Sequence, residues 1–307
     1  MNKSCLIGFL MCSAFSLVVQ AATDGAHITK TISQIERKKG IKRTIQYRPD
    51  GNDFVCVNGK NRYTRALYGG ITDFRIETSD RPVFATYKPK DSKHICFRLQ
   101  CGNQSIALDS LKFCEARYRA GRRTYRLTDP LLGKGELNIS VLAFPDAEGG
   151  IWRFTMKDMP EGALLHCYIS EIRAKNLSRN GDMGADRADS FDAPQLPKEQ
   201  KHYKLSLDGT TAYIVVEDQE LRLPALVEGT SLYDKSEKWR SEIESSLQIS
   251  TPDPYFNPLG GALAAAADGI WDGKIWLHGA IGWRSQLNGW RAAYIGDFIG
   301  WHDRART

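Results

Sequence analysis

The feature of this sequence that most constrains its fold is a series of short, β-prone runs between about residues 43 and 173. The runs are rich in β-branched and aromatic residues, and Pro-Asp-Gly, Asn-Gly and Gly-Gly clusters separate them at intervals of roughly 8–12 residues. They are RTIQYR (43–48), DFVCV (53–57), PVFATY (82–87), HICFRL (94–99), SIALDS (105–110), ELNISVLAF (136–144), IWRFTM (151–156) and ALLHCYI (163–169). This pattern is typical of an antiparallel β-sandwich. A barrel matches it less well, because nothing in the sequence requires the sheet to close.

The β-rich pattern pauses and then resumes further along the chain. Residues 175–201 are polar, rich in Asp, Gly and Pro, and lack apolar periodicity, so they predict a long surface loop. KLSLDG (204–209) and AYIVVED (212–218) then predict a hairpin through Asp208-Gly209, and ELRLP (220–224) predicts a strand that returns to the sandwich. We therefore expect one β-sandwich domain over residues 22–228.

A change of period after residue 229 predicts a helix that connects the sandwich to the C-terminal segment, with a linker over 229–250. Thr230 or Ser231 is suited to cap its start, and Pro252 and Pro254 lie beyond its end. The apolar residues at helical spacing, which predict the stripe that packs on the sandwich, are Leu232, Trp239, Ile243 and Leu247.

The N-terminus predicts export. Lys3 is followed by an uncharged apolar run from Cys5 to Val19, and Val19-Gln20-Ala21 supplies the small residues that signal peptidase needs. The run is shorter than the ~20 residues of a spanning helix. We therefore predict that residues 1–21 form a cleaved signal peptide. The mature protein would then be periplasmic or extracellular and would have no membrane span. The alternatives are an uncleaved anchor and a lipoprotein signal at Leu10-Met11-Cys12.

Charge and cysteine content exclude several classes of function. Removal of the signal peptide takes away Lys3 and no acid, so the formal charge falls from +6 to +5, and the basic residues are scattered. We therefore expect no nucleic-acid partner. The spacing of the five remaining cysteines is unlike that of a zinc site, and no motif for a cofactor occurs. We interpret these cysteines as buried residues of strands, and one disulfide among them is the alternative. They are Cys56, Cys96, Cys101, Cys114 and Cys167.

The C-terminal segment differs from the rest of the chain, because five of the seven tryptophans lie in its last 37 residues. GGALAAAADGIW (260–271) predicts a short helix that ends near Asp268-Gly269, and residues 288–305 predict a second helix capped by Asn288. One stripe along the second helix carries aromatic residues and a single carboxylate, and the neighbouring stripe carries only small residues. The aromatic stripe is Trp290, Tyr294, Asp297 and Trp301, and the small one is Gly289, Ala293, Gly296 and Gly300.

Aromatic rings with a few polar groups are suited to hold sugar rings in a cleft. The alternative is that these rings form a core, that Asp297 pairs with Arg291 or Arg304, and that His278 and His302 are ordinary packed or surface histidines.

The segment TPDPYFNPLGGALAAAADGIWDGKIWLHGAIGWRSQLNGWRAAYIGDFIGWHDRA resembles the entry into the catalytic domain of large exported bacterial glycosidases of the six-hairpin superfamily. These proteins pair an N-terminal β-sandwich with an (α/α)6 toroid. The resemblance implies a mainly β chain in which the sandwich and connecting helix lead into the first helices of an incomplete toroid, over residues 251–307. It also implies an oligo- or polysaccharide partner. The substrate-binding residues would be Trp283, Trp290, Arg291, Tyr294 and Asp297.

The resemblance carries over no catalytic residue. Glycoside hydrolysis commonly uses two carboxylates that flank the scissile bond, and Asp268, Asp272, Asp297 and Asp303 form no pair that the spacing supports. The first hypothesis is therefore the N-terminal part of a polysaccharide-degrading glycoside hydrolase that is inactive alone. The alternatives are a non-catalytic carbohydrate-binding or scaffolding β-sandwich and a cell-envelope protein without a sugar ligand.

Overall fold

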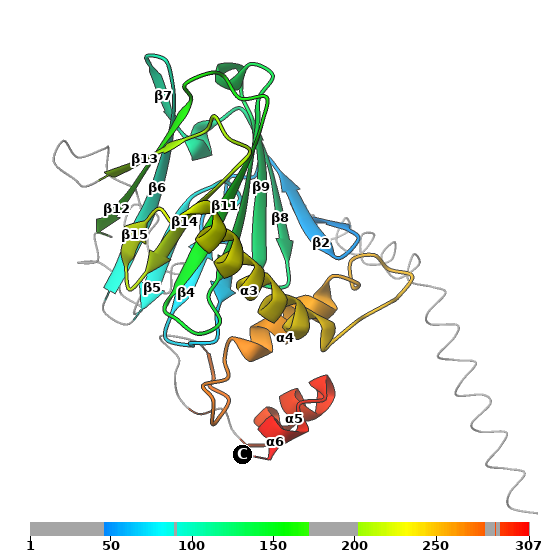
Figure 1. Cartoon of the computed structure of the whole chain (residues 1–307). Coiled ribbons are helices and arrows are strands. Elements are labelled where there is room, and N and C mark those ends of the chain that lie inside the picture. The colour runs from blue at the N-terminus through cyan, green and yellow to red at the C-terminus, as the bar shows by residue number, and fades with distance from the viewer. Residues whose placement is uncertain (1–45, 89–90, 172–201, 280–285, 287–288, 307) are drawn as a thin grey trace, which may run out of the picture.

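The structure is a computed structural model that describes residues 46–88, 91–171, 202–279, 286 and 289–306. Two antiparallel sheets stack face to face, and a group of helices lies at one end of the stack (Figure 1). The mainly β prediction and its antiparallel sandwich are confirmed. The predicted signal peptide (1–21) and the predicted surface loop (175–201) lie outside the described residues.

The first sheet has eight strands, and every neighbouring pair in it is antiparallel. In spatial order its strands are β1 (Arg48–Asp50), β2 (Asp53–Val57), β8 (Phe113–Arg119), β9 (Arg122–Thr128), β10 (Glu136–Ala143), β11 (Gly149–Lys157), β14 (Thr211–Glu217) and β15 (Glu220–Arg222).

The second sheet has seven strands, of which β7 (Gln104–Ala107) pairs with β6 only. The other strands, in spatial order, are β13 (His202–Ser206), β12 (Leu164–Glu171), β6 (Asp91–Cys101), β5 (Phe84–Lys88), β4 (Arg75–Thr78) and β3 (Arg65–Tyr68). Two short 3-10 helices, η1 (Leu108–Ser110) and η2 (Pro130–Leu132), come after β7 and β9.

The core lies between the two sheets and has the period of two that strands impose on side chains. Along β8 and β9 every second residue is buried. Aromatic rings from both sheets meet edge to face in the centre, where Phe84 contacts Trp152 and Tyr125 at centroid distances of 5.7 and 5.6 Å. Such contacts add to the free energy of simple burial.

A buried polar cluster links the two sheets at one end. Arg123 on β9 and Asp80, which lies just after β4, are both fully buried, with 3.9 Å between Nη2 and Oδ1. Arg123 also donates to the Ser79 carbonyl at 2.8 Å, and the Tyr125 hydroxyl donates to the same oxygen. A buried charge is tolerated only when it is paired and hydrogen-bonded in this way.

The predicted hairpin through Asp208-Gly209 is wrong. Its two strands, β13 and β14, belong to different sheets, and the turn carries the chain from one sheet to the other. Leu207 is buried at this corner, where its amide donates to the Ala163 carbonyl at 2.9 Å. Asp208 accepts from the Gly162 amide at 3.1 Å. Core burial of Leu207 between the sheets thus overrides the local hairpin signal. The strand predicted at ELRLP is confirmed, because β15 pairs with β14.

The connecting helix is α3 (Leu226–Ser245), which starts earlier than the sequence predicts. Ala225, directly after Pro224, is its N-cap residue, and neither Thr230 nor Ser231 caps it. The predicted stripe is confirmed only for Leu232, which packs against the hydrophobic cluster under α3. The buried side of α3 carries Gly229, Tyr233, Ser236 and Arg240, whereas Leu232, Trp239, Ile243 and Leu247 are only half-buried.

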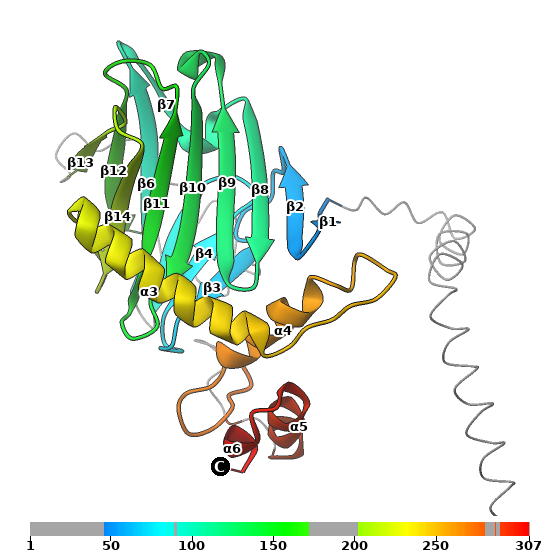
Figure 2. The same cartoon turned by 45° about the vertical axis from the view of Figure 1, so that its right-hand side comes forward.

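Helix α3 lies across the outer face of the eight-stranded sheet (Figure 2). There Tyr233 packs in a second hydrophobic cluster with Leu142, Phe144, Ile151, Tyr213 and Val215. The ring of Tyr233 also lies 3.9 Å from the guanidinium of Arg153, and its hydroxyl bonds to that of Ser140 at 2.6 Å. Gly229 and Tyr233 therefore make the close contact with the sheet, and Leu232 packs beside them.

The helical tail consists of α4 (Leu259–Asp268), α5 (Gly289–Ile299) and α6 (His302–Ala305). Helix α4 ends at Gly269 as predicted. The prediction of a single helix over 288–305 is wrong, because the helix is interrupted at Gly300, which has φ 85°. Gly300 takes the left-handed conformation that glycine adopts at helix ends. Among the described residues, no helix is both long enough and apolar enough to cross a membrane.

The close packing of α3 on the sheet can be tested at Gly229. A Cβ at this position would lie 2.5 Å from Cγ of Tyr213, so Gly229→Ala forces the helix away from the sheet. We expect a loss of about 1–2 kcal/mol in the free energy of unfolding, because overpacking outweighs the gain of about 1 kcal/mol in helix propensity. Chemical denaturation measures it. Gly209→Ala is the matched control, since no atom lies within 4 Å of its added Cβ. Equal stability of Gly229→Ala and wild type would contradict the close packing.

Candidate functional site

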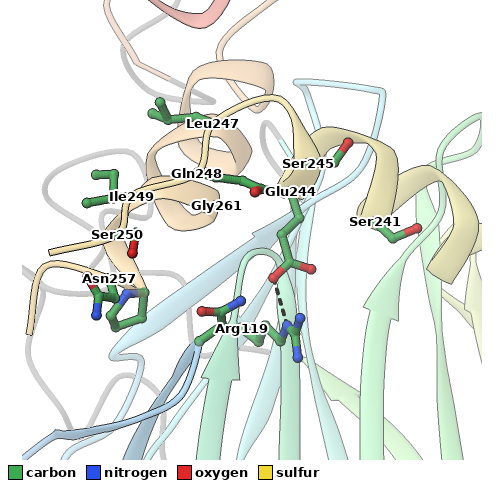
Figure 3. A pocket seen from close by; sticks show the side chains of 12 residues that line it. Arg119, Ser241, Glu244, Ser245, Leu247, Gln248, Ile249, Ser250, Asn257 and Gly261 are labelled. Atoms are coloured by element: carbon green, nitrogen blue, oxygen red, sulfur yellow. Dashed lines mark hydrogen bonds and ion pairs between the residues drawn. The ribbon is translucent and has the colours of Figure 1, made fainter. Parts of the chain in front are cut away.

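The candidate site is a pocket of about 500 Å³ where the sandwich meets the helical tail (Figure 3). We call it the junction pocket. It is bounded by the C-terminal end of α3, the segment between α3 and α4, the start of α4 and the ends of β2 and β8. Its polar lining includes Asn52, Arg119, Glu244, Gln248, Ser250 and Asn257.

Two glycines at the start of α4 make this arrangement possible. A Cβ on Gly260 would lie 2.7 Å from the Leu247 carbonyl oxygen, and a Cβ on Gly261 would lie 2.8 Å from Cγ of Glu244. Helix α4 can therefore approach the end of α3 closely. The loop between them is held by Asn257, whose Oδ1 accepts from the Thr251 amide at 2.8 Å. The wall formed by this loop thus has a defined geometry.

An ion network fixes the end of α3 to the β8–β9 hairpin. The carboxylate of Glu244 accepts from Arg119 Nε at 2.7 Å and from Arg240 Nη1 at 2.7 Å. Arg240 also bonds to Glu237, which in turn accepts from Arg122 at 2.8 Å. Because this network joins residues of the helix and of the sheet, it holds the pocket floor in place.

The same network determines the protonation of Glu244. Burial alone would raise the pKa of this carboxyl, but hydrogen bonds from Arg119 and Arg240 outweigh burial and leave the pKa below its ordinary value. Glu244 is therefore ionised at neutral pH. It is unsuited to act as a general acid, which needs a raised pKa.

The sequence-predicted binding residues are only partly described. Trp283 lies outside the described residues, and Trp290 and Arg291 lie in α5 but their side chains are outside them. Tyr294 is 68% exposed on α5. Asp297 is exposed and bonds to His302 Nδ1 at 3.1 Å. Neither of these last two lines the junction pocket.

Three of the tail tryptophans have structural contacts. Trp276 is buried and donates from Nε1 to the Ala267 carbonyl at 3.2 Å. The guanidinium of Arg304 lies 4.3 Å from the ring of Trp301 and 5.5 Å from that of Trp271. Trp301 lies beyond the break in α5, so it does not continue the predicted aromatic stripe. Of these three, Trp301 belongs to the predicted aromatic stripe, and its ring packs against Arg304.

Gly296, one residue of the predicted small stripe, makes a close contact with neighbouring parts of the tail. A Cβ on Gly296 would lie 2.7 Å from Cβ of Ala305 and 2.8 Å from the ring of Trp276. Gly296 therefore lets α6 and Trp276 pack directly on α5.

Asp268 at the end of α4 also has an ion-pair partner within the tail. It accepts from Arg304 at 2.7 Å and is largely buried. Burial raises the pKa of this carboxyl, although Arg304 opposes the shift. Asp268 therefore ties α6 to α4.

A second pocket of about 410 Å³ lies in the sandwich itself, over β5, β6, β12 and η1. His94, Cys96 and Tyr168 contribute buried side chains to it, and Arg62 and Arg98 also line it. Burial raises the pKa of the Cys96 thiol to about 11, so it is protonated at neutral pH and a poor nucleophile.

The five cysteines that come after the predicted signal peptide are all free thiols. The prediction of buried cysteines is confirmed for Cys56, Cys96, Cys114 and Cys167, while Cys101 is half-buried. In the part of the chain that the structure describes, no group of three or more His, Cys, Asp or Glu residues is placed to hold a metal ion.

Comparison with known families gives one match. Residues 89–217 match the model of a family described as a domain of unknown function, DUF4450. The match covers less than half of the chain. It runs from the start of β6 to the end of β14, so it contains much of both sheets but neither α3 nor the helical tail. No curated protein matches the chain.

The residues of the junction pocket were not identified from the sequence. The available signal is the spacing of Glu237, Arg240 and Glu244, which places two acids and one base on a single side of a helix. Their partners on the β8–β9 hairpin are over 100 positions away, so only the fold brings them together.

The Glu244 network makes a pH-dependent prediction. Because the pKa of Glu244 is lower in the folded than in the unfolded chain, its contribution is complete above the ordinary glutamate pKa and is lost as pH falls through the lowered value. We expect Glu244→Gln to lower the free energy of unfolding by about 1–2 kcal/mol at neutral pH. The deficit should shrink below about pH 4.

Denaturation of wild type and variant across this pH range measures the effect. The control is Glu242→Gln, an exposed glutamate on the same helix, which should change stability by less than about 0.5 kcal/mol. A deficit for Glu244→Gln that stays constant into the acid range would show that the charge is not its source.

Proposed function

We propose that this chain is the N-terminal part of an exported carbohydrate-active protein, a polysaccharide-degrading glycoside hydrolase, and that it does not hydrolyse glycosidic bonds by itself. In this proposal the sandwich and α3 support a helical catalytic domain that begins with α4. Export is inferred from residues 1–21. The class of substrate is inferred from the resemblance of the tail to six-hairpin glycosidases.

The observation that carries the proposal is the distribution of exposed apolar side chains. Five of the eight large ones among the described residues lie after α3: Tyr255 and Phe256 in the segment before α4, and Leu263, Tyr294 and Phe298 in the helical tail. An apolar surface concentrated in this way marks a region that packs against a partner or holds a ligand. Further helices of the same protein would cover part of it, as in an (α/α)6 toroid, and saccharide would contact the rest.

The carboxylates of the tail and pocket support the lack of activity. A glycosidase needs two carboxyl groups that can exchange protons or attack on either side of one bond. Here Glu244 is held by two arginines, Asp268 by Arg304, and Asp297 by His302. Asp272 accepts from the amides of the turn that it begins.

A non-catalytic carbohydrate-binding sandwich is the second candidate. The observation that favours it is the pocket of about 410 Å³ formed by the sandwich alone, most of it within the family match. Under this alternative, substitutions in the sandwich pocket, such as Arg98→Ala, would weaken saccharide binding more than substitutions in the tail.

The full chain tests the proposal in two assays. Affinity electrophoresis through gels that contain single neutral or acidic polysaccharides should show retardation by at least one of them. A reducing-end assay with that polysaccharide should show no release above the buffer blank. Release of reducing ends would contradict the claim of inactivity, and no retardation by any polysaccharide would contradict the carbohydrate partner.

The tail residues can be tested in the same gels. Tyr294→Ala removes an exposed ring suited to contact a sugar face, and Asp297→Asn removes a charged acceptor. We expect each substitution to weaken retardation by about fivefold to tenfold in apparent affinity. Val227→Ala is the control, since Val227 is an exposed apolar residue on α3. Unchanged retardation of both tail variants would remove α5 from the saccharide surface.

A further inference from the structure

We propose that the junction pocket binds a neutral, polyhydroxylated ligand, namely a segment of an uncharged oligosaccharide. The class of ligand rests on the proposed function, whereas the position and the neutrality of the ligand come from the pocket itself. This site is separate from the tail residues Tyr294 and Asp297, which do not line it.

The charges in the pocket are already compensated. Among the described residues, the charged ones that line it are Arg119 and Glu244, and they bond to each other at 2.7 Å, as the dashed line in Figure 3 shows. The second oxygen of Glu244 is held by Arg240. An anionic or cationic ligand would have to break this network and leave one charge without a partner, which is costly. A neutral ligand leaves the network intact.

Uncommitted polar groups surround this ion pair. In the part of the chain that the structure describes, the side chains of Asn52, Gln248 and Ser250 make no hydrogen bond, although all three line the pocket. An amide offers a donor and an acceptor side by side, and a hydroxyl offers both on one atom. Sugar hydroxyls have the same dual character, so a saccharide can replace the water that solvates these groups.

Apolar and hydroxyl groups complete the lining. Leu247, Ile249 and Pro258 provide carbon surface that suits the C–H face of a sugar ring. The hydroxyls of Ser241 and Ser245 donate to backbone carbonyls at 2.8 Å, which leaves their oxygens free to accept. The volume of about 500 Å³ is within the usual range for small-molecule sites.

The ligand would contact two parts of the chain at once. Asn52 comes from the turn between β1 and β2, whereas Gln248 and Asn257 come from the segment between α3 and α4. A saccharide bound to both sides should therefore hold the start of the helical tail against the sandwich. Because it binds only the folded arrangement, it should also raise the unfolding temperature.

The test uses the full chain with neutral oligosaccharides of cello-, xylo-, manno- and malto-series, and with oligogalacturonate as a charged comparison. Calorimetric titration measures affinity, and a thermal scan with and without sugar measures stabilisation. We expect at least one neutral series to bind and oligogalacturonate to bind at least tenfold more weakly. Asn52→Ala and Gln248→Ala should each weaken binding by about fivefold to tenfold.

The matched control is Asn103→Ala, which removes an exposed amide from the turn between β6 and β7, outside the pocket. It should bind like wild type. All three substituted side chains are exposed, so the variants should fold, and their unfolding temperatures without sugar verify this.

The outcomes separate this inference from the proposed function. If a polysaccharide retards the chain, and Asn52→Ala and Gln248→Ala bind it as tightly as wild type, the pocket assignment is overturned while the proposed function stands. Tighter binding of oligogalacturonate than of any neutral series would also overturn it. If no saccharide binds in gels or in solution, both fail.

Discussion

The structure depends on the need to bury both faces of the eight-stranded sheet over β10, β11 and β14. On β14, Val215 faces Tyr233 of α3 and Val216 faces the second sheet, and both are fully buried. Each such side chain contributes about 1.5–3 kcal/mol when it leaves water. The inner face is covered by the seven-stranded sheet, and the outer face requires α3. Since α3 leads directly into α4 and the junction pocket, this second packing surface determines the position of the helical tail.

Much of the sandwich could be predicted from the sequence, because its strands alternate or form short apolar runs bounded by turn residues. Strands β2, β10 and β14 begin and end within a residue of the predicted runs. Local patterns could not show which strands share a sheet. Asp208-Gly209 has the composition of a hairpin turn, yet it joins β13 in one sheet to β14 in the other. The deciding factor is the burial of Leu207 in the core, which is a tertiary contact.

The side chains that seat α3 could not be predicted by choosing its most apolar stripe. That rule selects Leu232, which packs against the cluster, but also Trp239 and Ile243, which stay half-buried. The close approach is made at Gly229 and Tyr233, because a small residue beside one ring lets the helix lie near the sheet. Toward its C-terminal end the helix lies against the charged hairpin of β8 and β9, where Arg240 is buried with acidic partners. The candidate site escaped prediction for the same reason. Its residues come from distant segments. In the tail, Trp271 packs on Trp276, and Arg304 lies over the rings of Trp271 and Trp301.

Glu244 takes part both in the packing of α3 on the sandwich and in the pocket, since it anchors α3 and also lines the pocket. Its partner Arg119 belongs to the sheet, so the floor of the pocket is part of the sandwich, whereas Gln248 and Asn257 belong to the segment that leads into the helical tail. A ligand bound between the two parts would therefore stabilise the arrangement in which residues of both parts contact it. Under the proposed function, polar groups at such a boundary would connect recognition of a saccharide in the pocket to the orientation of α4 and the tail that follows it. A sandwich that only displayed a ligand on one sheet would have no such connection.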